Sequence, residues 1–292
     1  MRPIIDIISQ MQKPAGVFAK GEQQVADFIL GDLENTAFLN QNEIATAAQV
    51  SVATVNRFCI TLGCIGFRDF KIRLAQSVAV SLQYLNSKPK DNLTPHLAVD
   101  QVFNGLEAAL GMARQQLQAA EIDQAIATLG AARRIIFFGV GGGSANVARE
   151  GANRFFRLGI PSEAHSDGYF QRMLASTLGT GDVVFAISAS GQPRELLDSV
   201  AIAKQYGATS ISLTARGSPL ALLSDISLTL DLPEDRDIFK PSASRLVFMA
   251  VIDVLATGAA RQNPALTMEN LRRIRTSLVA LSQDTGPQPI GD

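Results

Sequence analysis

Cysteine, histidine and tryptophan are scarce or absent in this chain of 292 residues, which has two cysteines, two histidines and no tryptophan. Cys59 and Cys64 are too few for a disulfide scaffold. With no histidine or further cysteine close by in the sequence, they also cannot complete a tetrahedral metal site. We therefore expect two buried thiols, no metal site and no bound cofactor.

A large net charge and long apolar runs are also missing. The chain has 26 basic and 27 acidic residues, so any contact with a polyanion must come from a local patch. The longest apolar stretch, residues 246–260, contains Asp253 and is shorter than the roughly 20 residues of a membrane span. Asp6 and Gln10 interrupt the apolar N-terminus, unlike a secretory signal. We expect a soluble, cytoplasmic protein with no membrane partner.

Composition divides the chain into two domains. Apolar residues make up 47% of the sequence, and 292 residues fit two domains at about 150 residues each. Prolines, charges and small polar residues gather over 86–96 and disfavour helix there. We predict a domain over residues 1–85, a linker over 86–98 and a domain over 99–292. Apolar residues at helix spacing indicate about five helices and no strand in the first domain.

The second domain has short apolar runs separated by helix-length segments. Such runs without alternation are typical of a parallel sheet covered by helices on both faces. The predicted fold class of this domain is therefore α/β, with a five-stranded parallel sheet flanked by helices. The expected strands are residues 134–138, 161–165, 182–187, 209–213 and 226–230, and two helices over 242–260 and 266–282 close the chain.

A helix-turn-helix is predicted over residues 42–58. Ser51 is a suitable N-cap for the second helix. The turn between the helices has Gln49 at a position where glycine is common, so its backbone must be strained or altered there. One face of the first helix consists of small and apolar residues, namely Ile44, Ala45 and Ala48.

The outer side of the second helix is predicted to contact DNA. Because Val55 and Phe58 bury the inner face, polar side chains are left where a recognition helix meets base edges. Residues 50–80 contain four basic residues and one acid, a local charge of +3 that suits phosphates. The alternative is an ordinary helical hairpin with a basic surface. The predicted DNA-contacting residues are Ser51, Thr54, Asn56, Arg57 and Lys71.

Turns rich in glycine and serine follow three of the predicted strands. The carboxyl ends of parallel strands are where open α/β sheets bind ligands, and hydroxyls and amides there suit a phosphate. A dinucleotide site is disfavoured, because Gly139-x-Gly141-x-x-Ser144 lacks the last glycine and no acid ends a following strand. Purely structural turns remain the alternative. The predicted phosphate-binding residues are Ser144, Ser188, Ser190 and Thr214.

These turns, together with the helix-turn-helix, make nearly the whole chain similar to the RpiR family of regulators. The segments that carry the resemblance are Ser51–Phe58, Gly139–Ser144, Ser188–Glu195 and Thr214–Leu220. The resemblance implies a transcriptional regulator, acting as a homodimer or homotetramer, whose sugar isomerase (SIS) domain senses a phosphosugar and thereby releases operator DNA. For one group of the family the implied effector is 2-keto-3-deoxy-6-phosphogluconate. Two departures from the family pattern are a longer glycine-rich turn and Pro193 in place of a hydroxyl residue.

An enzyme is the alternative function, because an aldose–ketose isomerase also binds phosphosugars. Such an enzyme needs a base near the substrate, and Glu195 and His165 are the candidates here. The fused helix-turn-helix makes a sensor the simpler account. Cations that could complement a phosphate or carboxylate are Arg172, Arg194, Lys240 and Arg245.

Overall fold

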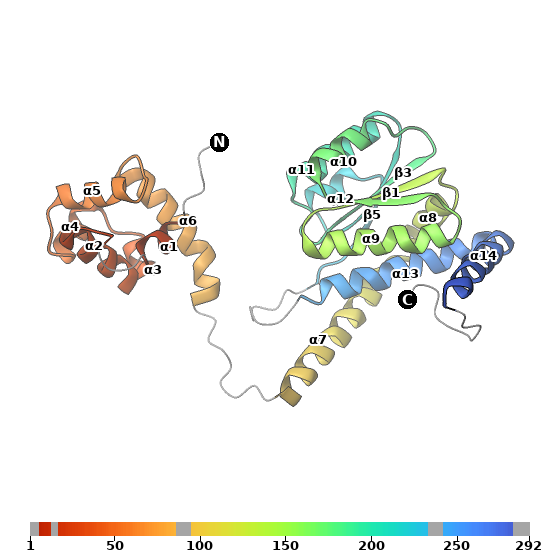
Figure 1. The fold of residues 1–292 in the computed structure, drawn as a ribbon, viewed down its shortest axis with the longest axis horizontal. Coiled ribbons are helices and arrows are strands. Elements are labelled where there is room, and N and C mark those ends of the chain that lie inside the picture. The colour runs from red at the N-terminus through yellow and green to blue at the C-terminus, as the bar shows by residue number, and fades with distance from the viewer. Residues whose placement is uncertain (1–5, 13–16, 86–94, 233–241, 283–292) are drawn as a thin grey trace. The chain divides into compact units, whose positions relative to one another are not determined.

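The computed structural model describes residues 6–12, 17–85, 95–232 and 242–282 (Figure 1). They fall into two compact units, each with its own apolar core: an N-terminal unit whose last described residue is Leu85, and a C-terminal unit that begins at Pro95. Helix α7 (Pro95–Gln116) starts inside the range predicted as linker. Proline is well tolerated in the first turn of a helix, where its missing N–H would have had no partner.

The N-terminal unit has six helices among its described residues: α1 (Ile7–Met11), α2 (Lys20–Gly31), α3 (Leu33–Thr36), α4 (Gln41–Ala47), α5 (Val52–Thr61) and α6 (Phe67–Leu85). In its core Phe58 meets Phe70 edge to face, with ring centroids 6.1 Å apart. Cys59 and Cys64 lie buried in the same core as free thiols, as predicted. Burial, reinforced by the charge of Cys64, raises the pKa of Cys59 to about 12, so this thiol stays protonated.

The C-terminal unit contains the predicted five-stranded sheet. Its strands are β1 (Arg134–Gly139), β2 (Ser162–His165), β3 (Asp182–Ser188), β4 (Thr209–Thr214) and β5 (Ile226–Thr229). They pair in the order β2-β1-β3-β4-β5, and every pair is parallel. From β1 the chain first adds β2 on one side of the sheet, and it then adds β3, β4 and β5 on the other side. The strand order therefore reverses between β1 and β3. This switch point is where open α/β sheets bind ligands.

Helices cover both faces of this sheet (Figure 1). Along β1, Ile135 and Phe137 pack with α8 (Ala119–Gly130), α9 (Gly142–Arg157) and α13 (Ser244–Gln262). Ile136 and Phe138 point to the opposite face, into a second core. The helices on that face are α10 (Gly168–Ala175), α11 (Arg194–Gln205) and α12 (Pro219–Leu223), and α14 (Pro264–Ser282) packs on α9 and α13.

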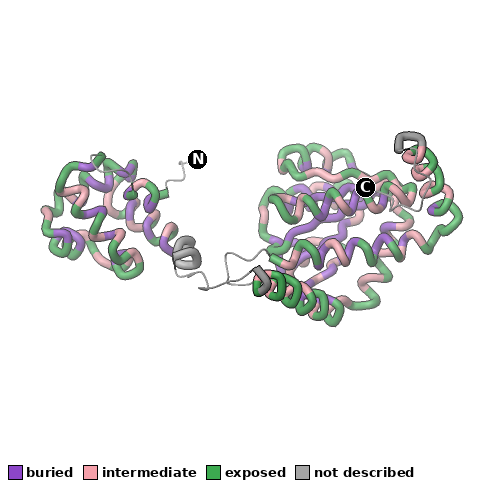
Figure 2. The backbone as a smooth tube through the Cα atoms, turned by 60° about the horizontal axis from the view of Figure 1, so that its bottom comes forward, coloured by how far each residue is buried: buried purple, intermediate pink, exposed green. Residues whose placement is uncertain are grey.

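Figure 2 shows the result as buried strands inside a shell of helices with exposed outer sides. The amphipathic helix α8 was absent from the sequence-based prediction. In the described part of the chain, none of the helices combines the length and the apolar character that a membrane crossing requires.

Candidate functional site

A cavity of about 690 Å³ opens at the carboxyl edge of the sheet. It is lined by residues that end or follow β1, β3, β4 and β5, so it includes the switch point between β1 and β3. Its volume is that of a typical pocket for a small organic ligand. The polar lining residues are Ser144, Ser188, Ser190, Asp231 and Ser244, and the others are apolar or proline, including Val140, Leu230 and Phe248.

Three helices begin at this cavity. Ser144 lies in the first turn of α9, Pro193 is the N-cap of α11, and Ser244 is the first residue of α13. None of the three N-cap residues accepts a hydrogen bond through its side chain. The first N–H groups of α9 and α11 therefore have no acceptor among the described residues, whereas the Ser244 N–H of α13 donates to the Ser242 hydroxyl at 3.3 Å. The positive end of each helix dipole lies beside the cavity. Since the described lining contains no lysine or arginine, helix ends and hydroxyls supply the anion-binding capacity.

Ser144 is held close to the end of β1. A Cβ atom on Gly139 would lie 2.4 Å from the carbonyl oxygen of Ser144, so only glycine permits this approach. The N-cap of α9 is Gly141, and Ser144 is the third residue of the helix. Because its hydroxyl has no hydrogen-bond partner among the described residues, it is available to a ligand in the cavity.

Ser188 and Ser190 belong to the turn after β3. The Ser188 hydroxyl accepts a hydrogen bond from the Gly191 N–H at 3.0 Å, and the Ser190 hydroxyl accepts one from the Gln192 N–H at 3.3 Å. In both residues the hydroxyl oxygen shapes the turn, which leaves the O–H group to donate. Both residues line the same cavity as Ser144.

Thr214 is placed differently from the prediction. It is fully buried and does not line the cavity. Its hydroxyl lies 3.2 Å from that of Ser218, and a Cβ atom on Gly191 would meet the same two hydroxyls at 2.6 and 2.2 Å. Thr214 therefore packs beneath the turn that carries Ser188 and Ser190, and it supports this turn from below.

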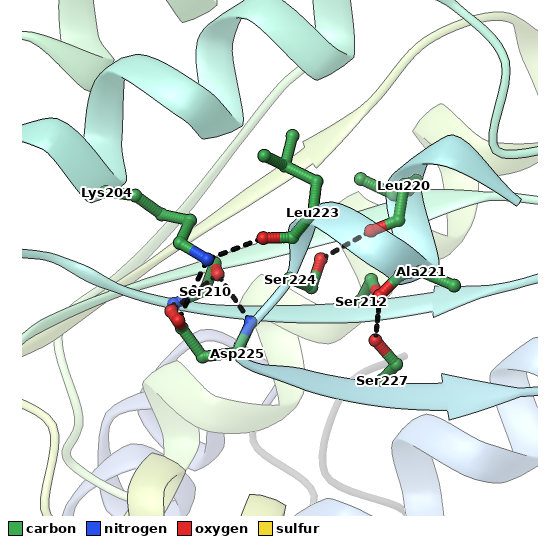
Figure 3. Close-up of polar contacts among 9 residues, drawn as sticks. All are labelled: Lys204, Ser210, Ser212, Leu220, Ala221, Leu223, Ser224, Asp225 and Ser227. Atoms are coloured by element: carbon green, nitrogen blue, oxygen red, sulfur yellow. Dashed lines mark hydrogen bonds and ion pairs between the residues drawn. The ribbon is translucent and has the colours of Figure 1, made fainter.

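The short helix α12 is fixed by hydrogen bonds near its end and at the start of the next strand (Figure 3). The Lys204 ammonium donates to the carbonyl of Leu223 at 2.5 Å, and the Ser227 hydroxyl donates to the carbonyl of Ala221 at 2.6 Å. Ser218 caps this helix by accepting the Ala221 N–H at 3.2 Å. The support under the turn after β3 is therefore anchored on both α11 and β5.

Asp231 and Ser244 were missed by sequence reasoning. Asp231 comes two residues after β5. The principle that ligands bind at the carboxyl ends of parallel strands would therefore have indicated it, as it did the serines after the other strands. Ser244 gave no such signal, because the sequence of a helix start does not indicate which part of the protein that helix end faces. Of the candidate cations, Arg172 pairs with Asp198 at 3.3 Å, Lys240 lies outside the described residues, and Arg194 and Arg245 are exposed without lining the cavity.

The candidate isomerase bases lie outside the cavity lining. His165 ends β2, where its Nε2 atom is 3.1 Å from a carboxylate oxygen of Glu163 and its ring packs on Phe170 at 4.8 Å. Glu195 stands in the first turn of α11 and is exposed, with its side chain beside Gly168.

In the N-terminal unit, the turn between α4 and α5 has the strained backbone predicted for it. Gln49 has φ of +55°, and it is the non-glycine residue with positive φ in the described part of the chain. The Gln49 N–H donates to the carbonyl of Thr46, and the Val50 N–H donates to that of Ala45. These two bonds form a Schellman motif, in which glycine normally occupies the Gln49 position.

Helix α5 presents the predicted polar side. Ser51 caps it by accepting the Thr54 N–H at 3.1 Å, while Val55 and Phe58 are fully buried. Asn56 and Arg57 are exposed on the outer side, and one guanidinium nitrogen of Arg57 lies 3.3 Å from the Thr54 hydroxyl. This helix therefore has the exposed polar residues that base contacts require.

Lys71, one of the predicted DNA-contacting residues, is bound to main-chain carbonyls of its own unit. Its ammonium donates to the carbonyls of Leu39 at 2.6 Å, Thr36 at 3.4 Å and Ala37. Burial lowers the pKa of Lys71, and the charge of Glu43 offsets this only partly. The basic patch is reduced further because Arg73 pairs with Asp69 at 3.0 Å. Of the four basic residues counted from the sequence, Arg57 and Arg68 remain exposed.

Comparison with known proteins identifies both units. The helix-turn-helix domain of the rpiR family matches residues 5–81, and the SIS domain matches residues 128–258. The chain is 38% identical to the transcriptional regulator HexR of Pseudomonas aeruginosa and 36% identical to HexR of Escherichia coli, each over 274 residues. These alignments cover 94% of this chain and 96% and 94% of the two relatives. NanR of Vibrio vulnificus, solved in complex with ManNAc-6P, shares the fold with a TM-score of 0.59 at 23% identity, over 96% of this chain and all of that one.

Proposed function

The chain belongs to the RpiR family of helix-turn-helix transcriptional regulators, with HexR proteins among its relatives, and from this premise we propose that its C-terminal cavity senses a phosphosugar that releases operator DNA. One observation carries the proposal. The N-termini of three helices and four serine residues surround a cavity whose described lining contains no lysine or arginine. Such a site binds an anion through N–H dipoles and hydroxyls.

The proposed phosphate position lies between the first turn of α9 and the turn after β3. There Ser144, Ser188 and Ser190 donate their hydroxyls to phosphate oxygens, together with the first N–H groups of α9. Pro193 supplies no donor, so the phosphate depends on these neighbouring groups. Thr214 acts as a positioning residue, because it supports the turn without lining the cavity.

We propose 2-keto-3-deoxy-6-phosphogluconate as the effector. This ligand carries a phosphate and a carboxylate, and a cavity with more than one helix N-terminus suits two negative groups. The volume of about 690 Å³ accommodates a six-carbon sugar acid phosphate. Ser244, at the start of α13, is the polar residue beside the second helix end.

The proposed DNA contacts come from α5. Arg57 has the donor geometry to pair with guanine and Asn56 the geometry to pair with adenine, while Ser51 and Thr54 at the helix start contact the phosphate backbone. Lys71 is left out of this set because its ammonium is bound to main-chain carbonyls. A regulator that meets chromosomal DNA in this way acts in the cytoplasm of a bacterial cell.

We propose that the protein works as a homodimer or homotetramer. Two recognition helices are needed to bind the two halves of a pseudo-palindromic operator about one helical turn apart. Helix α7 exposes apolar side chains that a second copy can cover, among them Val102, Phe103 and Leu110. The molar mass in solution, measured by light scattering, tests this part of the proposal.

The alternative function, sugar-phosphate isomerisation, lacks an unengaged base in the described cavity lining. Asp231 is the carboxylate there, and it is engaged by Arg216 through the main-chain N–H at 3.1 Å and through Nε at 3.4 Å. The cavity is therefore proposed as a sensor site and not as a catalytic one. Incubating the protein with a bound phosphosugar and searching for a new sugar product separates the two functions.

The test combines DNA binding with ligand titration on the full chain. Duplexes selected by the protein from a random pool supply the operator, and the titrants are 2-keto-3-deoxy-6-phosphogluconate, 6-phosphogluconate, glucose 6-phosphate and fructose 6-phosphate. We expect 2-keto-3-deoxy-6-phosphogluconate to raise the Kd for the operator. Ser144→Ala should blunt this response and leave DNA binding intact. Ser277→Ala, an exposed serine on α14, is the matched control.

Operator affinity that stays constant at saturating concentrations of all four sugars would refute the sensor function. A response to another member of the panel would retain the sensor function and replace the proposed effector.

A further inference from the structure

The last residue of α7 holds the main chain of a cavity-lining residue. The Gln116 side-chain amide donates to the carbonyl of Asp231 at 3.0 Å, and its oxygen accepts the Asp231 N–H at 2.7 Å. These two bonds join residues that are 115 positions apart in the chain. Both main-chain polar groups of Asp231 are thus committed to one side chain.

Helix α7 also packs against a second wall of the same cavity. Ala109 and Ala113 are buried in the core that also contains Phe248 of α13, and α7 packs against α13. Phe248 and Ser244, both on α13, line the cavity. Helix α7 therefore contacts two structures that face the ligand space directly, Asp231 and α13.

Asp231 also connects to the loop after β4. Its carboxylate accepts the Arg216 N–H at 3.1 Å and lies 3.4 Å from Nε of the same arginine. The preceding residue, Leu230, donates its N–H to the carbonyl of Thr214 at 2.9 Å. A ligand hydroxyl that binds the Asp231 carboxylate must compete with Arg216. Any resulting shift of the Asp231 main chain stretches the two bonds to Gln116, and hydrogen bonds of this length weaken within a few tenths of an ångström.

We propose that this Gln116–Asp231 clamp transmits occupancy of the cavity to α7, the described helix that follows the N-terminal unit in the chain. The proposal rests on the proposed function, since it assigns the route by which the phosphosugar acts on DNA binding. Gln116 is a positioning residue in this scheme, because it acts through Asp231 and does not line the cavity. Coupling of this kind is reciprocal, so operator DNA must weaken phosphosugar binding by the same factor.

Gln116→Ala in the full chain tests the clamp. The quantity to measure is the coupling factor, the ratio of the operator Kd with saturating phosphosugar to the Kd without it. The probe is whichever sugar of the four-member panel gives the largest factor with the wild-type chain. Coupling factors in allosteric proteins are commonly about 5–150. For Gln116→Ala we expect a factor near 1, with the sugar affinity of the DNA-free protein and the operator affinity of the sugar-free protein both retained.

Two further variants make this result specific. Gln116→Glu keeps an acceptor for the Asp231 N–H but cannot donate to its carbonyl, so it should give an intermediate factor. Gln115→Ala removes an exposed glutamine of the same helix and should keep the wild-type factor. Calorimetric titration of the sugar onto each DNA-free variant separates lost coupling from lost binding.

The outcomes are distinct. A wild-type coupling factor in Gln116→Ala would overturn the clamp and leave the sensor function standing. Loss of sugar binding by Gln116→Ala would also overturn it, because Gln116 would then shape the cavity instead of transmitting its state. If no sugar of the panel affects operator binding by the wild-type chain, the proposed function fails, and the clamp proposal fails with it.

Discussion

Gly191 is the residue whose replacement should most directly damage the cavity. It occupies the turn after β3 with φ of +64°, a conformation that side chains rarely adopt. In Gly191→Ala the new methyl group would lie 2.2 Å from the Ser218 hydroxyl oxygen and 2.6 Å from that of Thr214. Neither neighbour can retreat easily, because Thr214 is fully buried and Ser218 caps α12.

Gly217→Ala is the matched control for the size of this effect. Gly217 has φ of +66°, nearly the same backbone conformation, but a methyl group there would meet no atom within 4 Å. In both variants the strain of an alanine in the left-handed conformation should lower the free energy of unfolding by about 1–2 kcal/mol. Gly191→Ala should add about 1–3 kcal/mol for overpacking, giving a total destabilisation of about 2–5 kcal/mol.

Urea denaturation followed by tyrosine fluorescence measures these differences. The chain has no tryptophan and three tyrosines, of which Tyr169 and Tyr206 lie in the C-terminal unit. We also expect Gly191→Ala to weaken phosphosugar binding while the sugar-free protein still binds operator DNA. Equal destabilisation by the two substitutions would refute the packing argument, because the crowding around Gly191 is the feature that distinguishes them.

Three further predictions address other parts of the chain. Gln49→Gly should stabilise the N-terminal unit by about 0.5–1 kcal/mol, since relief of left-handed strain exceeds the entropic cost of glycine; a lower urea midpoint would contradict this. Burial acts to raise the pKa of Asp182, but hydrogen bonds and charges, chiefly from Arg134, outweigh it and lower the pKa below its ordinary value of 3.8. The stability that Asp182 contributes is therefore present above pH 3.8 and lost as the pH falls through the lower folded-state pKa, so melting temperatures between pH 2 and 6 should vary less in Asp182→Asn. Arg57→Ala should weaken operator binding by about 1–3 kcal/mol in anisotropy titrations, whereas Lys71→Ala should lower the melting temperature and spare the affinity of the folded protein; the reverse pattern would contradict both assignments.

Local sequence patterns were sufficient for the architecture. Apolar runs of strand length predicted β1, β3, β4 and β5, the less apolar segment 161–165 was the prediction for β2, and the N-cap Ser51 predicted the start of α5 correctly. The strained turn at Gln49 was also predictable, because glycine is the residue that its position favours. Such features depend on neighbours within a few residues, and periodicity and capping chemistry express them directly.

The position of the candidate cavity was also predictable from the sequence, because ligands bind at the carboxyl ends of parallel strands. Parallel strands bring their carboxyl ends to one edge, so Ser144, Ser188 and Ser190 had to lie near each other. This principle predicts the edge of the sheet at which a residue lies, but it does not predict whether the side chain of that residue is exposed there. Thr214 stands at the same edge and is buried under the neighbouring turn.

The sequence by itself determined the helical character of the N-terminal unit, the parallel sheet and the edge at which a ligand can bind, because each follows from residue spacing and the directions of consecutive elements. Only the tertiary structure decided how individual side chains are used. In the folded chain Lys71 donates hydrogen bonds to main-chain carbonyls 32 to 35 residues away in the sequence, and Gln116 is hydrogen-bonded to Asp231, 115 residues away. Partners of this kind meet because whole elements pack together, and no local pattern records which atoms that packing brings within hydrogen-bonding distance.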